Sequence, residues 1–374
     1  MKKLAAGGVA IIALALGLSA CGAPPASTGG ASTAPSAATS APASTAPGAA
    51  NFKACLVSDT GGFNDKSFNE AAKQGVDQAV AQLGITSDEI ESKTTADYAT
   101  NITNLLANNC SVIIATGFNL ETAMVSAAQA SPNSHFAIVD DNPAKKQPNL
   151  KPIVFKTSEA GFLAGYAAAA YSKTGKVGTW GGMQIPTVTI FMDGFADGVA
   201  QYNTDYSKNV QVLGWDKTKQ SGSFINSFTD QSLGQSMTTN LMTQGADVIM
   251  PVAGNAGMGA ATVVQAKASS GAALVWVDQD GFVSMPQYGD ILLTSVMKGI
   301  QSAVYNMIDQ EVTQGSFDAT PYVGTLANQG VQIAPFHNFS SKLPADVQTK
   351  ITDLQNQIVS GSLKITSPAD SALS

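Results

Sequence analysis

The most restrictive feature of this chain is an alternation of short apolar runs with segments of helical periodicity, which begins near Asn51. Within 71–83, for example, apolar residues recur at the spacing of one helix face. Parallel strands that are buried on both faces have such continuous apolar runs, and the helices between them form the crossovers. We therefore predict an α/β fold with doubly wound parallel sheets. The predicted strands are 54–57, 112–115, 136–139, 176–178, 210–213, 248–250, 274–277 and 291–293.

The series of strands and helices starts a second time in the middle of the chain. Residues 55–83 read as a strand, a glycine-containing turn and a helix, and residues 176–202 repeat that order with Gly181 and Gly182 in the turn. A chain of 374 residues is also long for one domain of about 150 residues. Two lobes in series imply a cleft at the carboxyl ends of their strands, where open parallel sheets bind ligands.

The N-terminal segment has the pattern of an exported lipoprotein. Two lysines precede an apolar stretch over 4–18, and Leu18-Ser19-Ala20-Cys21 resembles a lipoprotein cleavage box. We expect a signal peptide over 1–20, cleavage before Cys21 and lipidation of that cysteine, with palmitate among the acyl groups. Residues 22–50 contain only Gly, Ala, Pro, Ser and Thr, which predicts a flexible tether. The predicted location is the extracytoplasmic face of the cell membrane.

Composition narrows the possible ligands and partners. All 20 basic residues are lysine and the formal net charge is −7, which argues against nucleic acid, because its recognition needs a basic face and usually arginine. Sites that clamp phosphate or carboxylate also favour arginine, so a neutral, hydroxylated or aromatic ligand fits better. The two histidines, His135 and His337, are too scattered to suggest a metal site or a triad. We predict no catalytic residue, metal or cofactor.

The first turn between a strand and a helix is the most informative stretch. It reads Asp59-Thr60-Gly61-Gly62-Phe63-Asn64-Asp65-Lys66-Ser67-Phe68-Asn69-Glu70 and lacks the glycine spacing of a phosphate loop. Ser67 and Glu70 fit a capping box, which predicts that the helix starts at Phe68. Phe68 and Asn69 then lie in the first helical turn at the cleft, where they can stack on and hydrogen-bond to a ligand.

The run from Val57 to Asn69 resembles the signature of the basic membrane protein (BMP) family of ABC-transporter substrate-binding lipoproteins. The resemblance implies the type I periplasmic-binding-protein fold, in which three crossovers join two lobes that close on a ligand by a hinge. It also implies binding of nucleosides, preferentially purine ones, and delivery to the permease subunits of an ABC importer. Further matching segments follow in order between Asn51 and Gln310, among them 159–166, 175–178, 181–182, 194–198, 245–249, 277–280 and 294–298.

The same resemblance predicts how the chain is divided. We expect a first lobe of residues 51–157 with about 296–318, and a second lobe of residues 158–295 with about 319–374. We expect the protein to be a monomer.

Ligand-contacting roles carry over onto matching positions of the first lobe. Asp59, Phe68 and Asn69 match the first binding segment, with Phe68 expected on one face of the base. Asp140 matches a carboxylate at the base edge, and its neighbour Asp141 is the alternative. A stacked ring and carboxylates suit a purine, which offers two π faces and N–H groups along its edge.

The second lobe contributes the remaining expected contacts. Phe228 matches the second stacking aromatic, with Phe224 as the alternative, and Gly254 would let the backbone approach the ligand. The group expected on the ribose hydroxyls is Lys298 together with Asp278 or Asp280.

Two other functions and one covalent bond stay open. Stacking aromatics with aspartates also suit a sugar receptor of the same fold, and Asp59 with Asp278 could serve a nucleoside or glycoside hydrolase. Cys55 and Cys110 remain once Cys21 is lipidated, and in an exported protein they form either a disulfide or two buried thiols.

Overall fold

The computed structural model describes residues 48–373. The predicted signal peptide, Cys21 and most of the predicted tether lie outside these residues. The described part begins with a 3-10 turn over Ala49–Asn51, whose Ala49 is buried in the hydrophobic core. The packed body therefore begins slightly before Asn51, within the segment that we assigned to the tether.

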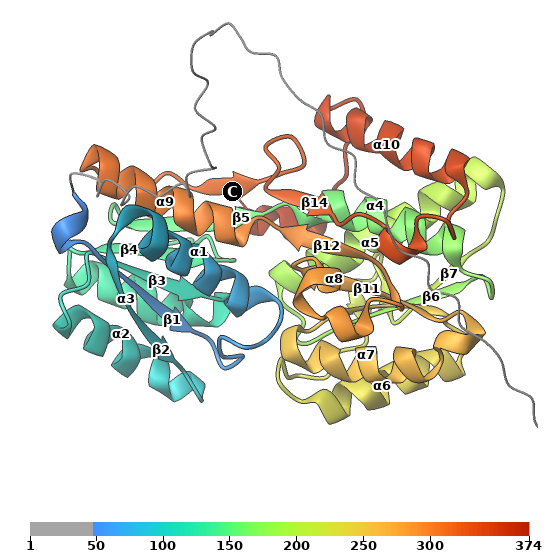
Figure 1. Cartoon of the computed structure of the whole chain (residues 1–374), viewed down its shortest axis with the longest axis horizontal. Helices are drawn as coiled ribbons and strands as arrows, with labels where there is room; N and C mark the ends of the chain where they lie inside the picture. The colour runs from blue at the N-terminus through green and yellow to red at the C-terminus, as the bar shows by residue number, and fades with distance from the viewer. Residues whose placement is uncertain (1–47, 374) are drawn as a thin grey trace, which may run out of the picture. The chain divides into compact units, whose positions relative to one another are not determined.

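Two six-stranded sheets form the framework (Figure 1). All pairs of the first sheet are parallel, and its order is β13-β5-β4-β3-β1-β2. The second sheet has the order β14-β12-β11-β10-β6-β7 and is parallel except for the pair of β12 with β14. The strands of the first sheet are β1 (Lys53–Ser58), β2 (Thr86–Glu91), β3 (Val112–Thr116), β4 (His135–Val139), β5 (Leu150–Phe155) and β13 (Tyr322–Gly324). Those of the second are β6 (Lys176–Gly181), β7 (Gln211–Leu213), β10 (Val248–Val252), β11 (Ala273–Asp278), β12 (Leu292–Lys298) and β14 (Val331–Ile333), and a small hairpin joins β8 (Trp215–Asp216) to β9 (Ser221–Gly222).

Helices cover both faces of each sheet, which confirms the predicted doubly wound arrangement (Figure 1). We call the first sheet with α1, α9, α2 and α3 the first lobe, and the second sheet with α4 to α8 and α10 the second lobe. The helices of the first lobe are α1 (Phe68–Leu83), α2 (Tyr98–Ala107), α3 (Glu121–Ala130) and α9 (Ile300–Gln314). Those of the second are α4 (Thr157–Tyr171), α5 (Pro186–Tyr206), α6 (Gln231–Thr243), α7 (Gly257–Ala266), α8 (Gly281–Ser284) and α10 (Ala345–Val359).

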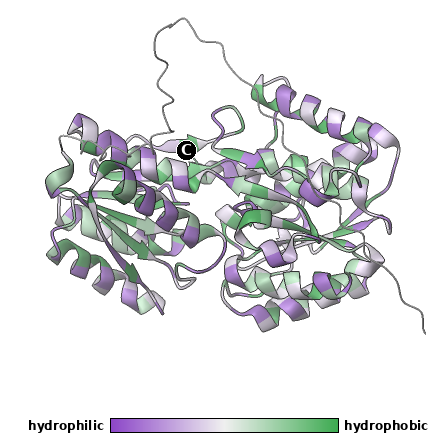
Figure 2. Cartoon of the chain, viewed as in Figure 1, coloured by the Kyte–Doolittle hydropathy of each residue, from purple (hydrophilic) through white to green (hydrophobic). Residues whose placement is uncertain are grey.

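The apolar runs become central strands because both of their faces are covered. In β3, Val112 and Ile114 pack into the core beneath α1, whereas Ile113 and Ala115 pack into the core beneath α2 and α3. All four side chains are fully buried. Figure 2 shows the same pattern as hydrophobic strands inside helices with hydrophilic outer faces. A strand that is apolar on both faces needs a layer on each side, and the crossover helices supply those layers.

The helices α4 and α5 pack closely through glycines. A Cβ at Gly165 would collide with the carbonyl oxygen of Phe195, and one at Gly198 would collide with the carbonyl oxygen of Phe162. Both glycines belong to segments that we matched to the family signature. Their missing side chains let the two helix backbones touch, so these glycines have a packing role in this chain.

The chain passes between the two sheets three times, as the family resemblance implies. It leaves the first sheet after β5, returns through α9, which packs on α1, to β13, and leaves again for β14. The predicted lobe boundaries do not coincide with the sheet edges. Residues 296–298 belong to β12 of the second sheet, and β13 lies in the first sheet although we expected its residues in the second lobe.

Two further features concern the covalent structure and the membrane. A disulfide joins Cys55 of β1 to Cys110, which precedes β3, so the bonded alternative holds rather than two thiols. Among residues 48–373, no helix has the length and apolar character needed to span a bilayer.

Candidate functional site

A single cavity brings together almost all of the predicted ligand-contacting residues. It is lined from both lobes, and small-molecule sites are often found between two domains in this way. It lies at the carboxyl ends of the strands, where the topology predicts a ligand. The predicted residues that line it are Asp59, Phe68, Asn69, Asp140, Phe228, Gly254, Asp278 and Lys298.

The start of α1 differs from the predicted capping box. The helix does begin at Phe68, but the Ser67 side chain caps no backbone N–H. Instead the Asp65 carboxylate accepts from the backbone N–H groups of Ser67, Asn69 and Glu70, at 3.0, 2.8 and 3.1 Å. An ionised carboxylate is a stronger acceptor than a hydroxyl at a helix N-terminus. The Ser67 hydroxyl is thereby free to donate across the cleft to Asp278.

Asp59 and Asn69 form the polar floor of the first lobe. Asp59 follows β1 and accepts from the Gly61 N–H at 2.8 Å and from Asn69 Nδ2 at 2.9 Å, both on Oδ1. Asn69 Nδ2 also donates to Asp65 Oδ2 at 3.1 Å, and Asn69 Oδ1 accepts from the Thr116 hydroxyl. Both residues are almost completely buried. The network fixes the two side chains relative to β1, β3 and α1.

Lys298 lies between the two lobes at the centre of the site. Its ammonium contacts Asp140 of the first lobe and lies 3.6 Å from Asp278 Oδ1 of the second. It also lies over the rings of Phe68 and Phe191, at 5.2 and 4.8 Å from their centroids. Among the described residues that line the cavity, Lys298 is the only cation and faces several carboxylates. Its charge is therefore already neutralised within the protein.

Asp140 and Asp278 occupy equivalent places in the two sheets. Asp140 directly follows β4 and Asp278 ends β11, and the two strands hold the same position in their sheets. Both have left-handed backbone conformations, with φ of 64° and 67°, which aspartate tolerates better than most residues. The turn redirects each side chain away from its strand and towards Lys298. The two lobes thus repeat the strand order and also the aspartate that each of them contributes to the site.

An aromatic ring from each lobe borders the cavity. Phe68 comes from the first turn of α1, and Phe228 lies in the loop before α6, against the backbone of Gly182. The alternative residue, Phe224, does not line the cavity. Its ring packs against Gly181 and meets Trp215 edge-on at a centroid distance of 5.9 Å. The structure therefore places Phe228, and not Phe224, at the site.

Asp280 lies outside the cavity, contrary to the sequence prediction. Its carboxylate accepts from the backbone N–H of Phe282 at 3.0 Å, which caps the short helix α8. Its other oxygen lies 2.8 Å from His337 Nε2, and the His337 ring stacks on Phe282 at 4.1 Å. Both oxygens of Asp280 thus serve the local structure. Asp278 is the aspartate of this pair that reaches the cavity.

Asp141, the neighbour of Asp140, does not line the cavity. Its Oδ2 is buried and has no hydrogen-bond partner among residues 48–373. Burial, reinforced by the nearby Glu121 carboxylate, raises the pKa of Asp141 to about 7. The left-handed turn at Asp140 points the two adjacent side chains in different directions, so only one of them can face the ligand.

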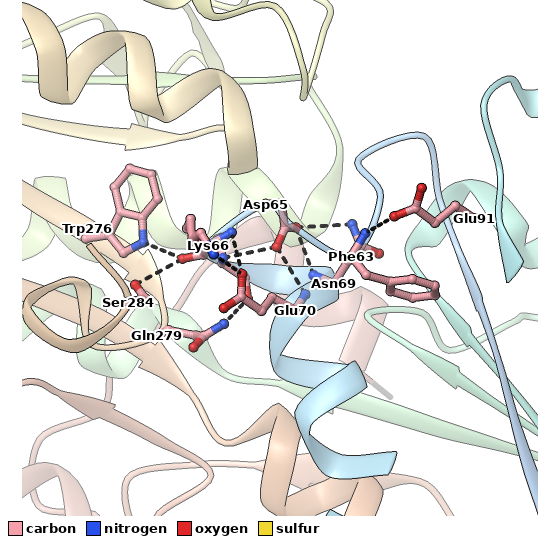
Figure 3. A network of polar contacts seen from close by, with 10 residues as sticks. Phe63, Asp65, Lys66, Asn69, Glu70, Glu91, Trp276, Gln279 and Ser284 are labelled. Atoms are coloured by element: carbon pink, nitrogen blue, oxygen red, sulfur yellow. Dashed lines mark hydrogen bonds and ion pairs between the residues drawn. The ribbon is translucent and has the colours of Figure 1, made fainter. Parts of the chain in front are cut away.

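The turn before α1 binds the second lobe through its backbone (Figure 3). Trp276 Nε1 and Ser284 Oγ both donate to the carbonyl oxygen of Lys66, at 3.0 and 3.2 Å. Gln279 Nε2 donates to the carbonyl oxygen of Ser67 at 2.8 Å. These contacts join the lobes directly beside the cavity, so the structure has the arrangement of a closed site.

Three of the cavity carboxylates, those of Asp59, Asp65 and Asp140, have raised pKa values. Burial raises the pKa of Asp59 above its ordinary value, against the opposing effect of its hydrogen bonds from Gly61 and Asn69. Burial also raises the pKa of Asp65 to about 7, and that of Asp140 to about 6 despite the Lys298 ammonium beside it. Ligand groups that donate hydrogen bonds to these oxygens would stabilise their ionised forms.

Sequence reasoning missed several residues of the site. Asp65 stands inside the family run that we recognised, but its capping role was assigned to Ser67. Phe191 of α5 and Asn119 after β3 also line the cavity. Asn119 follows an apolar strand by a few residues, which is a usable signal for a cleft residue. Phe191 lies in an apolar helix, and nothing in its surroundings distinguishes it from core residues.

Comparisons with known proteins identify a family and a fold. A family described as "ABC transporter substrate-binding protein PnrA-like" matches residues 52–368. The "ABC transporter nucleoside-binding protein BmpA" of Lactococcus lactis subsp. cremoris (strain MG1363) is 30% identical over 320 residues, which cover 81% of this chain and 87% of that protein. "Basic membrane protein D" of Borreliella burgdorferi (strain JD1) is 28% identical over 316 residues, covering 83% and 86%. A solute-binding protein of an ABC transporter system from Aeropyrum pernix K1 has a TM-score of 0.75 at 23% identity, covering 86% of this chain and 96% of that one.

Proposed function

Since the chain belongs to the Bmp family of PnrA-like ABC transporter substrate-binding proteins, we propose that it captures purine nucleosides between its two lobes for import. It binds the nucleoside without converting it. This is supported by one relative that is named as a nucleoside-binding protein of an ABC transporter and by the family model, which describes substrate-binding proteins.

One observation carries this proposal: the cavity is bordered by an aromatic ring from each lobe and by buried carboxylates between them. Phe68 and Phe228 suit the two faces of a purine, because stacking of a base on an aromatic side chain contributes about 1–3 kcal/mol. Asp59 and Asp140 suit the N–H groups of its edge. Asp278 with Lys298 suits vicinal ribose hydroxyls, which both accept and donate hydrogen bonds. Gly254, with a φ of 51°, lets the backbone approach the ligand.

Charge argues for a nucleoside rather than a nucleotide. Lys298 already contacts Asp140 and lies near Asp278, and the other charged groups at the cavity are carboxylates. A phosphate there would meet uncompensated negative charge. We therefore expect that a 5′-phosphate lowers affinity strongly.

Calorimetric titration of the full-length protein tests the proposal. Guanosine is the positive ligand, and cytidine, glucose and guanosine monophosphate are the comparisons. We expect tight binding of guanosine alone, and mass spectrometry should show no free guanine after prolonged incubation. Preferential binding of glucose would favour a sugar receptor, and release of guanine would favour a hydrolase. Either result contradicts the proposal.

We also propose that the protein is lipid-anchored at Cys21 and works outside the cytoplasm as a monomer that delivers ligand to its permease. The Cys55–Cys110 disulfide supports this location, because disulfides persist in oxidising compartments. Replacing Cys21→Ser should abolish acyl labelling and move the protein from the membrane to the soluble fraction. Continued membrane association of the correctly processed variant would contradict the anchor.

A further inference from the structure

Asn69 lines the cavity, yet its amide is committed to the protein. Nδ2 lies 2.9 Å from Asp59 Oδ1 and 3.1 Å from Asp65 Oδ2, so both of its hydrogens have carboxylate acceptors. Oδ1 accepts from the Thr116 hydroxyl. This orientation is the favoured one, because an amide oxygen that faced two ionised carboxylates would be repelled by both. No N–H of Asn69 remains for a ligand.

Asp59, in contrast, keeps one oxygen for the cavity. Oδ1 receives both the Gly61 N–H and Asn69 Nδ2. Within residues 48–373, no protein group donates a hydrogen bond to Oδ2. Oδ2 instead faces Gly117, whose absent side chain leaves the space open: a Cβ there would lie only 3.0 Å from this oxygen. Asp59 Oδ2 is therefore an acceptor in a fixed position that receives no hydrogen bond from the described residues.

We propose that Asn69 and Thr116 are positioning residues that hold Asp59 so that Oδ2 selects bases with N–H donors on their edge. This inference rests on the proposed function and narrows its ligand class to those purine nucleosides whose base edge carries an N–H donor. Guanosine has such donors, whereas purine riboside has none. Thr116 ends β3 and does not line the cavity. Its hydroxyl contacts Asn69 Oδ1 and lies 3.4 Å from the carbonyl oxygen of Val57, so it reaches the ligand only indirectly, through Asn69 and Asp59.

The alternative is that Asn69 reads the ligand directly, as the family resemblance implies. Direct reading would require Nδ2 to leave Asp59 Oδ1 and Asp65 Oδ2, which would then keep only their backbone N–H donors. Each move would give up a hydrogen bond to a buried carboxylate, and such bonds to charged groups contribute more than bonds between neutral groups. The observed network thus favours an indirect role for Asn69.

The test compares guanosine with purine riboside by calorimetry on the full-length protein and its variants. We expect the parent to prefer guanosine by about 10- to 100-fold, the range for a charge-assisted hydrogen bond. Thr116→Val keeps the side-chain shape but removes the donor, and should weaken guanosine binding by about 5-fold or more while leaving purine riboside binding unchanged. Thr116→Ser restores the hydroxyl and should restore the preference.

Thr179→Val is the matched control. Thr179 is a fully buried strand threonine of the second lobe, and its hydroxyl donates to the Met250 carbonyl oxygen at 2.9 Å. This variant suffers the same chemical change and should keep the parental preference. If Thr116→Val melts far below the parent, the two nucleosides are compared at a temperature at which the variant is fully folded.

Equal weakening of both nucleosides in Thr116→Val would overturn the inference and reduce Thr116 to a structural residue. A parent that binds both nucleosides equally would overturn the inference but leave the proposed function standing. A parent that binds neither would overturn the proposed function, and this inference with it.

Discussion

Phe228 and Phe224 provide a matched pair of aromatic residues in one segment. Phe228 lines the cavity, is half-buried and packs at the edge of the hydrophobic core, so Phe228→Ala removes a stacking face at a limited cost in core packing. Stacking worth about 1–3 kcal/mol corresponds to a loss of guanosine affinity of about 10- to 100-fold. Phe224 is also half-buried but packs on Trp215 and Gly181. Its removal should lower the free energy of unfolding by about 2–3 kcal/mol, below the 3–5 kcal/mol typical of a fully buried phenylalanine.

Calorimetry and urea denaturation separate the two effects. The free energy of unfolding is measured without ligand, and guanosine affinity is measured where each variant is fully folded. We expect Phe228→Ala to bind weakly and to lose less stability than Phe224→Ala, and we expect Phe224→Ala to bind like the parent once folded. Parental guanosine affinity in Phe228→Ala would refute the stacking role. A stability loss in Phe228→Ala as large as that in Phe224→Ala would show that its ring belongs to the core.

Three further predictions concern stability. The pKa of Asp141 is raised to about 7 by burial and by Glu121, so its ionisation lowers stability as pH rises from about 4 to about 7; Asp141→Asn should raise the melting temperature strongly near pH 8 and much less near pH 4. Replacing Cys55 and Cys110 by alanine opens a loop with a sequence separation of 55, and should lower the free energy of unfolding in urea by about 4 kcal/mol. Gly198→Ala places a Cβ against the Phe162 carbonyl oxygen and should cost about 1–3 kcal/mol in the same assay, whereas parental stability would show that α4 and α5 can separate.

The fold could be predicted where apolar pattern and burial coincide. The central strands β1, β3 and β11 are buried on both faces and were expected within a residue or two of their bounds. The edge strand β2 has the sequence Thr-Ser-Asp-Glu-Ile-Glu and is half exposed, so no apolar run marks it. The short strand β13 was missed because three residues carry no periodicity, and its pairing with β5 depends on long-range contacts.

The site could be predicted as a set of segments, but not as a hydrogen-bond network. Adjacent aspartates such as Asp140 and Asp141 cannot be ranked from sequence, because the choice depends on a left-handed turn that only the folded backbone shows. Ser67 has the sequence signature of an N-cap, yet Asp65 captures the helix N–H groups first. A sequence pattern indicates which groups could form a hydrogen bond. Which of these bonds forms depends on how the competing acceptors are placed in the folded protein.

The route of the chain has a consequence for the order of synthesis. The helix α9 and the strand β13 complete the first lobe, but they follow every strand of the second sheet except β14. In a nascent chain that ends near residue 157, β5 is therefore an open edge strand, because β13 has not yet been made. Helix α1 also lacks its neighbour α9, whose Gln301 carbonyl and Val304 side chain pack against Gly75 of α1 in the complete protein. Unpaired edges and uncovered apolar faces attract chaperones and other chains. The first lobe is thus begun first but completed only when β13 has been made. A translation stall or a C-terminal truncation before residue 325 therefore leaves this lobe incomplete, even though all of its central strands are present.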